Sequence, residues 1–218
     1  MTTKADTRIV DARREHIPFI AWVVLISHRS QLPKGLWDLM IDGDEAAVLR
    51  FLEAWVDTDQ MHWGHYTLFK VAEVDGVPAA ALCGFFENEL GLETAIAATA
   101  EANQRLGIAP EAAAAGWERA KSIAKLDNPR TPGAWVVEHV ATKPEYRRRG
   151  LVDLLIREML DRGRERGATV ANIGVFIGND AAQTAYEKAG FEVMNESCDA
   201  EFESVYGCPG ARELQRPI

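Results

Sequence analysis

Apolar residues in the first quarter of the chain follow the spacing of helices with one buried face. One set recurs at positions i, i+3, i+4 and i+7 and consists of Val48, Phe51, Leu52 and Trp55. Asp42 or Asp44 can cap the start of that helix. A short strand is predicted at 8–10, and Asp11 can cap a following helix whose apolar positions are Ile17, Ile20, Val24 and Ile26. Both helices are expected to pack against a core.

A β-hairpin is predicted next. Segments 66–74 and 77–86 are rich in Val, Phe, Leu and Ala. Asp75 and Gly76 between them form a dipeptide that closes two-residue hairpin turns.

The region from 90 to 125 is alanine-rich and has a helical character. Pro110 is well placed at a helix start, and a cluster of Asp, Asn, Pro and Gly follows before residue 134. We expect a helical insertion over about 87–132. It is either a helical pair that covers the sheet or a lid over a substrate.

Strands and helices alternate in the second half of the chain. The predicted strands are 134–142, 170–177, 191–193 and 200–206. The predicted helices are 151–166, which Gly167 can end, and a short one that begins at Asn179 or Asp180 and ends near Gly190. This order implies a parallel pair of strands beside the antiparallel hairpin. The expected fold class is α/β (α+β), with a mixed, twisted sheet flanked by helices in a single domain over 1–218.

The composition is that of an ordinary globular protein with an acidic balance. The chain has 218 residues, and its 24 basic and 33 acidic side chains give a net charge of −9. This charge argues against binding nucleic acid or an anionic membrane and favours a cationic substrate. No apolar stretch reaches the roughly 18 residues of a membrane span. The apolar run 17–26 imitates a signal-peptide core, but the acids Asp6, Asp11 and Glu15 before it disfavour a secretory leader.

Residues that bind metals or form disulfides are sparse. Cys83, Cys198 and Cys208 are odd in number and form no CxxC pair, so neither a disulfide framework nor a zinc site is indicated, and a reducing cytoplasm is expected. His62 and His65 lie three apart without a third ligand, so we predict no metal. Cys83 is expected to be a small buried residue within its strand.

The turn that joins strand 134–142 to helix 151–166 suits an anionic ligand. Its sequence is Arg147, Arg148, Arg149, Gly150, Leu151, Val152. Backbone amides and the positive end of the helix converge there, Gly150 permits close approach, and the arginines supply positive charge. The alternative is a solvated surface turn, and we prefer that interpretation for the later Arg162, Arg164 and Arg166. The turn is neither a Walker loop nor a dinucleotide fingerprint.

Two motifs resemble those of the GNAT superfamily of N-acetyltransferases. Residues 142–152 resemble its motif A, whose loop reads Gln/Arg-x-x-Gly-x-Gly/Ala; Arg147 and Gly150 match, whereas Val152 replaces a small residue. Residues 179–191 resemble motif B, Asn-x-x-Ala-x-x-x-Tyr-x-Lys-x-Gly-Phe. The resemblance covers 134–193, the expected cofactor-binding core. It implies a GNAT-type fold whose sheet splits near the strand ending at Thr142 and the strand starting at Val170.

The resemblance also implies acetyl-CoA as the acetyl donor, held in that split. The cofactor-binding residues that it implies are Val140, Ala141 and Thr142 for the pantetheine arm, Arg147, Arg148, Arg149, Gly150, Leu151 and Val152 for the phosphates, and Asn179 and Ala182 in motif B. Val152 would crowd the first turn of the helix, and Asn179 holds the pantetheine, caps its helix, or both. The backbone amide of Val140 would polarise the thioester carbonyl.

Transfer to an amine needs a proton acceptor and a proton donor. A lysine-like amine has a pKa of about 10.4 and is protonated at neutral pH. Glu138 interrupts an apolar strand nine residues before Arg147, where the resemblance implies a base; the alternative is a strand-edge glutamate or one paired with an arginine. Alternation along the strand would place Glu138, Val140 and Thr142 on one face and His139 on the other. The resemblance gives Tyr186 the role of acid for the leaving thiolate, and the alternative is an aromatic that fills space.

The acceptor is left open by the sequence. We expect a small-molecule amine, with Trp37, Trp55, Trp63 and Tyr66 lining its pocket or packing in the core. The alternatives are a protein amino group, or a non-catalytic acyl-CoA sensor. A homodimer is also left open.

Overall fold

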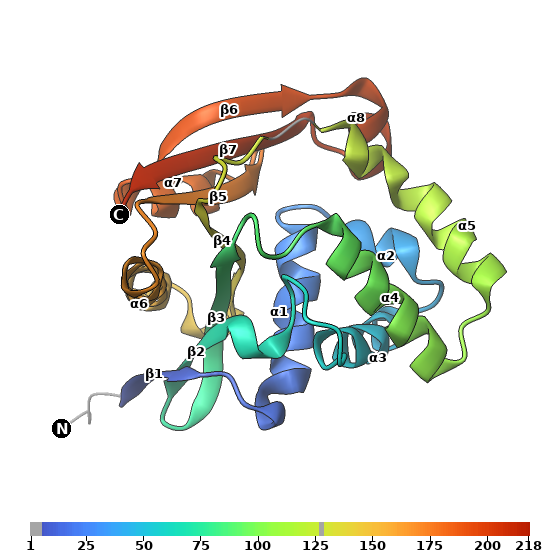
Figure 1. Ribbon diagram of the computed structural model, residues 1–218, viewed down its shortest axis with the longest axis horizontal. Helices are drawn as coiled ribbons and strands as arrows, with labels where there is room; N and C mark the ends of the chain where they lie inside the picture. Colours follow the sequence, from blue (N-terminus) through green and yellow to red (C-terminus); the bar gives the residue numbers. More distant parts are fainter. Residues whose placement is uncertain (1–5, 127–128) are drawn as a thin grey trace.

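A seven-stranded sheet forms the centre of the molecule (Figure 1), in a computed structural model that describes residues 6–126 and 129–218. The strands are β1 (Thr7–Asp11), β2 (Phe69–Val74), β3 (Val77–Phe86), β4 (Trp135–Thr142), β5 (Val170–Phe176), β6 (Glu192–Cys198) and β7 (Gly210–Pro217). Their order across the sheet is β1-β2-β3-β4-β5-β7-β6. Within the described residues, neighbouring strands pair antiparallel except β4 and β5, which pair parallel. The expected mixed sheet and the Asp75-Gly76 hairpin are confirmed.

The sheet splits between its two parallel strands. β4 and β5 pair only at Trp135–Ala171, Val136–Asn172 and Val137–Ile173. Beyond Val137 the two strands pair no further. In Figure 1 the strands β5, β7 and β6 form an arc that curves away from strands β1 to β4. The split lies where the sequence predicts it.

Helices cover both faces of this sheet. They are α1 (Ile17–Arg29), α2 (Leu36–Met40), α3 (Glu45–Val56), α4 (Leu92–Leu106), α5 (Pro110–Ala120), α6 (Leu151–Glu165), α7 (Asp180–Lys188) and α8 (Ala200–Tyr206). Short 3-10 helices are η1 (Arg14–His16), η2 (Tyr66–Leu68), η3 (Lys121–Lys125) and η4 (Pro144–Tyr146). None of the helices described between residues 6 and 218 combines the length and apolar character that crossing a bilayer requires.

Two hydrophobic clusters lie on opposite faces of the sheet. On one face α1 and α3 pack with Val136 of β4, and on the other α6 packs with Val137. Neighbouring residues of a strand point to opposite faces, so Val136 and Val137 identify the face on which each of them lies. We call these the α1 face and the α6 face.

Helices α4 and α5 lie outside the other helices. α4 packs on α3 and α5 packs on α2. Buried alanines at 95, 98 and 102 allow the close approach of α4, and Gly116 of α5 leaves no room for a side chain against the Met40 carbonyl. Residues 92–120 therefore cover the helical layer instead of lying directly on the sheet, as Figure 1 shows.

The start of α3 agrees with the sequence prediction, whereas the start of α1 does not. The Asp44 carboxylate accepts a hydrogen bond from the Ala47 amide at 3.0 Å and caps α3, as predicted. Asp11, in contrast, is the last residue of β1, and α1 begins at Ile17 after η1. The prediction of Asp11 as a cap was wrong because the chain inserts a further turn before the helix.

The C-terminal segment contradicts the prediction at 200–206. This segment is α8, capped by the Asp199 carboxylate, which accepts from the Phe202 amide at 2.9 Å. Phe202 and Tyr206 lie one helical turn apart and are buried together. β6 extends to Cys198, beyond the predicted 191–193, and β7 was not predicted. β7 is polar in sequence and is defined by pairing with both β5 and β6.

Candidate functional site

A β-bulge interrupts β4 beside the split. Ala81 pairs with Ala141 and Cys83 with Glu138, so His139 and Val140 together lie opposite Leu82. His139 takes a left-handed φ of 53°, which is uncommon for a residue other than glycine. Beyond Val137 this part of β4 has no β5 partner among the described residues, so the bulge lies where the strand borders the split.

The bulge changes which side chains share a face. Glu138 and His139 both lie on the α1 face, where the His139 Nε2 atom is 4.0 Å from the Glu138 Oε2 atom. The His139 Nδ1 atom lies 3.2 Å from the Ser27 hydroxyl of α1. Val140 instead packs on the α6 face. The prediction that Glu138 and Val140 share a face opposite His139 was wrong, because the extra residue reverses the alternation.

The turn before α6 exposes unpaired backbone donors. Gly150 precedes the helix with a left-handed φ of 76°, and no atom lies within 4 Å of where its Cβ would be. Among the described residues no side chain caps α6, so the first amides of the helix lack a side-chain acceptor there. Arg147, Arg148 and Arg149 are exposed around them. This arrangement suits an anion at the helix start.

Two of the three arginines support the turn itself. The Arg147 Nε atom donates to the Thr142 carbonyl at 3.4 Å, and an Arg149 nitrogen donates to the Glu145 carbonyl at 3.0 Å. The Arg149 guanidinium also lies over the Tyr146 ring, 5.0 Å from its centroid. The Val152 side chain packs against the hydrophobic cluster of the α6 face.

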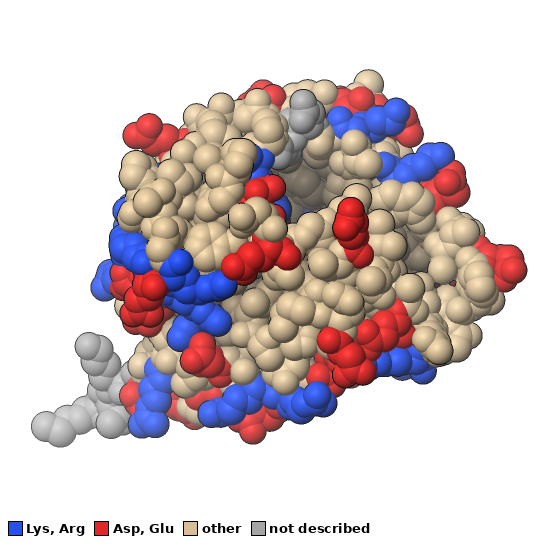
Figure 2. Space-filling view, viewed as in Figure 1, with Lys and Arg blue, Asp and Glu red and all other residues tan. Residues whose placement is uncertain are grey.

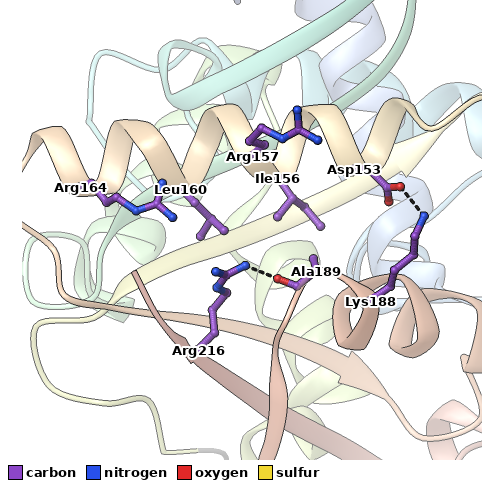
Figure 3. Close-up of a pocket in the computed structure, with 8 residues that line it drawn as sticks. All are labelled: Asp153, Ile156, Arg157, Leu160, Arg164, Lys188, Ala189 and Arg216. Carbon is purple, nitrogen blue, oxygen red and sulfur yellow. Dashed lines mark hydrogen bonds and ion pairs between the residues drawn. The ribbon is translucent and has the colours of Figure 1, made fainter.

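A basic pocket continues from the first turn of α6 toward α7 and β7. Its volume is about 340 Å³. Figure 3 shows the residues that line it, Asp153, Ile156, Arg157, Leu160, Arg164, Lys188, Ala189 and Arg216. Lys188 forms an ion pair with Asp153 at 2.7 Å, and Arg216 donates to the Ala189 carbonyl. The four basic side chains come from three elements, which is why sequence reasoning did not connect them. The spacing of Asp153, Arg157, Leu160 and Arg164 along one face of α6 was the signal available.

The motif B residues lie on α7 beside the split. The Asn179 side-chain oxygen accepts from the Ala182 amide at 3.2 Å, and its nitrogen donates to the Ser30 hydroxyl at 2.6 Å. Asn179 therefore caps α7. Tyr186 is buried on the α6 face in the same cluster as Val140. Burial raises the pKa of Tyr186, so its phenol stays protonated at neutral pH.

On the α1 face, Glu138 has an arginine partner. Arg130, in the loop before β4, forms an ion pair with Glu138, and its guanidinium lies 5.8 Å from the centre of the Phe85 ring. Burial lowers the pKa of Arg130, and the negative charge of Glu213 opposes that shift. This is the arginine-paired alternative for Glu138. The pair places a carboxylate and a guanidinium beside the bulge.

Glu213 of β7 is a second acid on this face and was missed by sequence reasoning. It is only 4% exposed, and its Oε1 atom has no hydrogen-bond partner among the described residues. Burial raises the pKa of Glu213 to about 7, and Arg130 acts in the opposite direction. No sequence signal identified it, because β7 itself was not predicted.

The aromatic and histidine candidates belong to the core around α1 and α3. Trp37 and Trp55 are buried, and Trp63 and Tyr66 pack against the same cluster. The Trp37 Nε1 atom donates to His28 at 3.3 Å, and the His62 Nε2 atom lies 2.9 Å from the Trp55 carbonyl. Cys83 is buried within β3, as expected. Burial lowers the pKa of His139, which is therefore neutral at pH 7.

Comparison with known proteins identifies the family. The profile of the acetyltransferase (GNAT) family matches residues 36–191. A structure described as an acetyltransferase is similar at a TM-score of 0.67 with 16% identity, over 97% of this chain and 99% of its own. An N-acetyltransferase from Staphylococcus aureus Mu50 gives 0.64 with 22% identity, over 96% and 100%. A polyamine N-acetyltransferase from Drosophila melanogaster gives 0.54 with 13% identity, over 98% and 100%. No curated protein matches the chain.

These structural similarities show the fold, and the family profile goes further. It spans more than half of the chain and includes both the glycine turn before α6 and the helix α7. The split sheet, the bulge in β4 and the uncapped start of α6 lie together within that span. The chain therefore belongs to the GNAT family of acetyltransferases.

Proposed function

We propose that this protein transfers the acetyl group of acetyl-CoA directly to the amine of a small cationic molecule. The observation that carries the proposal is the opening between β4 and β5, bordered by the bulge and by the uncapped start of α6. The end of the β4–β5 pairing lies between the residues proposed for the anionic donor and the acidic residues of the α1 face.

Acetyl-CoA fits the residues that surround this opening. Val140, Ala141 and Thr142 would hold the pantetheine arm along the edge of β4 that β5 leaves free. The amides of Leu151 and Val152, with Gly150 and the three preceding arginines, would bind the pyrophosphate. The basic pocket beside α6 would take the remaining phosphate of the nucleotide. Asn179 and Ala182 would border the arm from α7.

The chemistry that remains is positioning and proton transfer, because a thioester is already activated. The Val140 amide, at the bulge, would donate to the carbonyl oxygen as negative charge develops on it. Tyr186 would protonate the departing sulfur, since burial keeps its phenol protonated. Glu138, already paired with Arg130, would position the acceptor or a water beside the carbonyl.

Charge on the α1 face supports a cationic acceptor. Glu138 and Glu213 lie near Arg130, so these three groups together carry a net negative charge whenever Glu213 is ionised. Figure 2 shows the surface hollowed between the arc of β5, β7 and β6 and the helical layer, with acidic side chains at its edge. The Drosophila protein that shares this fold forms N-acetylagmatine, a product of a small cationic amine.

A thiol-release assay across amines tests the proposal. The protein is incubated with acetyl-CoA and agmatine, spermidine, a lysine-containing peptide or a peptide with a free α-amine, and free CoA is measured. We expect turnover with at least one small cationic amine and slower turnover with the peptides. Tight binding of acetyl-CoA without thiol release from any amine would instead indicate an acyl-CoA sensor. Faster turnover with a peptide would indicate a protein substrate.

A further inference from the structure

We propose that Glu213 is the carboxylate that receives the proton of the acceptor amine, and that the Arg130–Glu138 pair positions the acceptor beside it. This inference rests on the proposed function and assigns the proton transfer that function requires. It also makes the acceptor an amine that binds in its protonated, cationic form.

The register of the sheet brings Glu213 toward Glu138. Glu213 pairs with Gly174 of β5, and Val137 pairs with Ile173, so Glu138 and Gly174 are the next residues along the two parallel strands. Gly174 has no side chain to separate the two acids. A Cβ on Gly174 would lie 3.4 Å from the Glu213 Oε2 atom, so the carboxylate extends over β5.

One carboxylate oxygen of Glu213 is buried without a hydrogen-bond partner among the described residues. The residue is 4% exposed, and the Oε1 atom has no partner among the described residues. Gly174 beside it is exposed, so solvent or a ligand reaches the surface over which the carboxylate lies. A buried carboxylate with an unpaired oxygen is costly unless a ligand satisfies it. An ammonium group would supply the missing donor and a compensating charge.

Glu138 is less suited to hold that proton. Its carboxylate is in direct ion pair with Arg130 and therefore already has a charged partner. Arg130 is the charged group that acts on Glu213. The other titratable groups described around Arg130 are Cys83, Glu87 and its ion-pair partner Glu138, which His139 adjoins. Arg212 of β7 points away, since it bonds Gln183 of α7 and Glu196 of β6. Burial raises the pKa of Glu213 to about 7, where a base is effective at neutral pH.

The proton balance is complete without a further reactant. The ammonium gives one proton to the Glu213 carboxylate, and the neutral nitrogen forms a bond to the thioester carbonyl carbon. The carbon–sulfur bond breaks, and Tyr186 gives its proton to the sulfur. The nitrogen loses its second proton, which restores the Tyr186 phenol through solvent. Glu213 then releases its proton to water, so the amide, CoA thiol and one proton are the products.

The pH dependence of turnover tests the assignment. With the fastest amine from the thiol-release assay, kcat/KM is measured between pH 5.5 and 9 for the wild type and for Glu213→Gln, Glu138→Gln and Glu192→Gln. Glu192 is an exposed acid on the neighbouring strand β6 and serves as the matched control. Thermal unfolding and acetyl-CoA titration establish that each variant is folded and binds the donor. If Glu213→Gln does not fold, Glu213→Asp takes its place.

For the wild type and Glu192→Gln we expect kcat/KM to rise with pH to a plateau above about pH 7, since the base must be deprotonated. Glu213→Gln should lose that rise and about 10²-fold in kcat. If Glu213→Asp is used, it should shift the rise and lower kcat. Glu138→Gln should keep the rise and raise KM. An unaltered pH profile and kcat in the Glu213 variant would overturn the inference while leaving acetyl transfer intact. No turnover by the wild type with any amine would overturn the proposed function itself.

Discussion

Glu213 shows how a single residue links stability to chemistry. Its carboxylate is almost fully removed from water, and the nearby positive charge of Arg130 only partly offsets the cost of ionisation. A protein tolerates such a residue when its total stability exceeds the cost. Tyr186 on the opposite face is also buried, and burial raises its pKa as well. At neutral pH the Tyr186 phenol is therefore protonated, whereas Glu213 is close to the midpoint of its titration, and the two groups lie on opposite faces of the sheet.

The raised pKa of Glu213 predicts a stability that falls as pH rises. The pKa is 4.5 for the free group and about 7 in the folded protein, so the folded state holds the proton more tightly. The contribution of protonated Glu213 to the free energy of unfolding is fully present below the pKa of the free group. It is lost as pH rises through the pKa in the folded protein. At pH 8 the ionised group costs about 3 kcal/mol.

Glu213→Gln should therefore be more stable than the wild type at pH 8, by about 3 kcal/mol, with little difference at pH 4.5. Urea unfolding at the two pH values measures this, and Glu192→Gln supplies the control for a lost surface charge. A difference between Glu213→Gln and wild type that is the same at both pH values would show that Glu213 does not titrate in this range.

At the scale of elements, the turn before α6 carries the proposed binding of the donor. Its key position is Gly150, which has a left-handed φ and open space around it. Gly107 at the end of α4 shares both properties, with a φ of 66° and no atom within 4 Å of a Cβ. The two glycines therefore carry a similar conformational cost on substitution, although Gly150 precedes a helix and Gly107 follows one.

Gly150→Ala and Gly107→Ala should lose similar stability, about 1 kcal/mol each. Only Gly150→Ala should weaken acetyl-CoA binding, by about tenfold or more, because a methyl group would stand where the pyrophosphate approaches the backbone. Isothermal titration with acetyl-CoA, beside thermal unfolding, separates the two effects. Equal affinities in the two variants would place the donor elsewhere.

The elements that the sequence predicted are those with a strong local signal. The hairpin at Asp75-Gly76, the helix α3 with its Asp44 cap and the glycine turn before α6 all follow from short patterns. The bulge at His139 could not be predicted, because it depends on how β4 pairs with β3. The sequence of β7 lacks the apolar alternation of a strand, and its position in the sheet depends on pairing with β5 and β6. Glu213 was therefore missed together with its strand.

At the scale of the whole molecule, the split sheet joins two chemically different surfaces. The α6 face offers backbone amides, arginines and a basic pocket, whereas the α1 face carries Glu138 and Glu213. The protein has a net charge of −9, but its surface is locally basic where an anionic donor would bind. α4 and α5 pack on α3 and α2, so their role as a lid stays a prediction. The cytoplasmic location and a homodimer also stay predictions.

A crystal structure of the protein with bound acetyl-CoA tests this organisation most directly. We expect the pyrophosphate at the start of α6 beside Gly150, the pantetheine arm between β4 and β5, and the thioester carbonyl oxygen within hydrogen-bonding distance of the Val140 amide. The acetyl group would then lie between the Tyr186 hydroxyl and the Glu138 and Glu213 carboxylates. Acetyl-CoA bound outside the split, or with its thioester away from the bulge in β4, would contradict the proposed donor site.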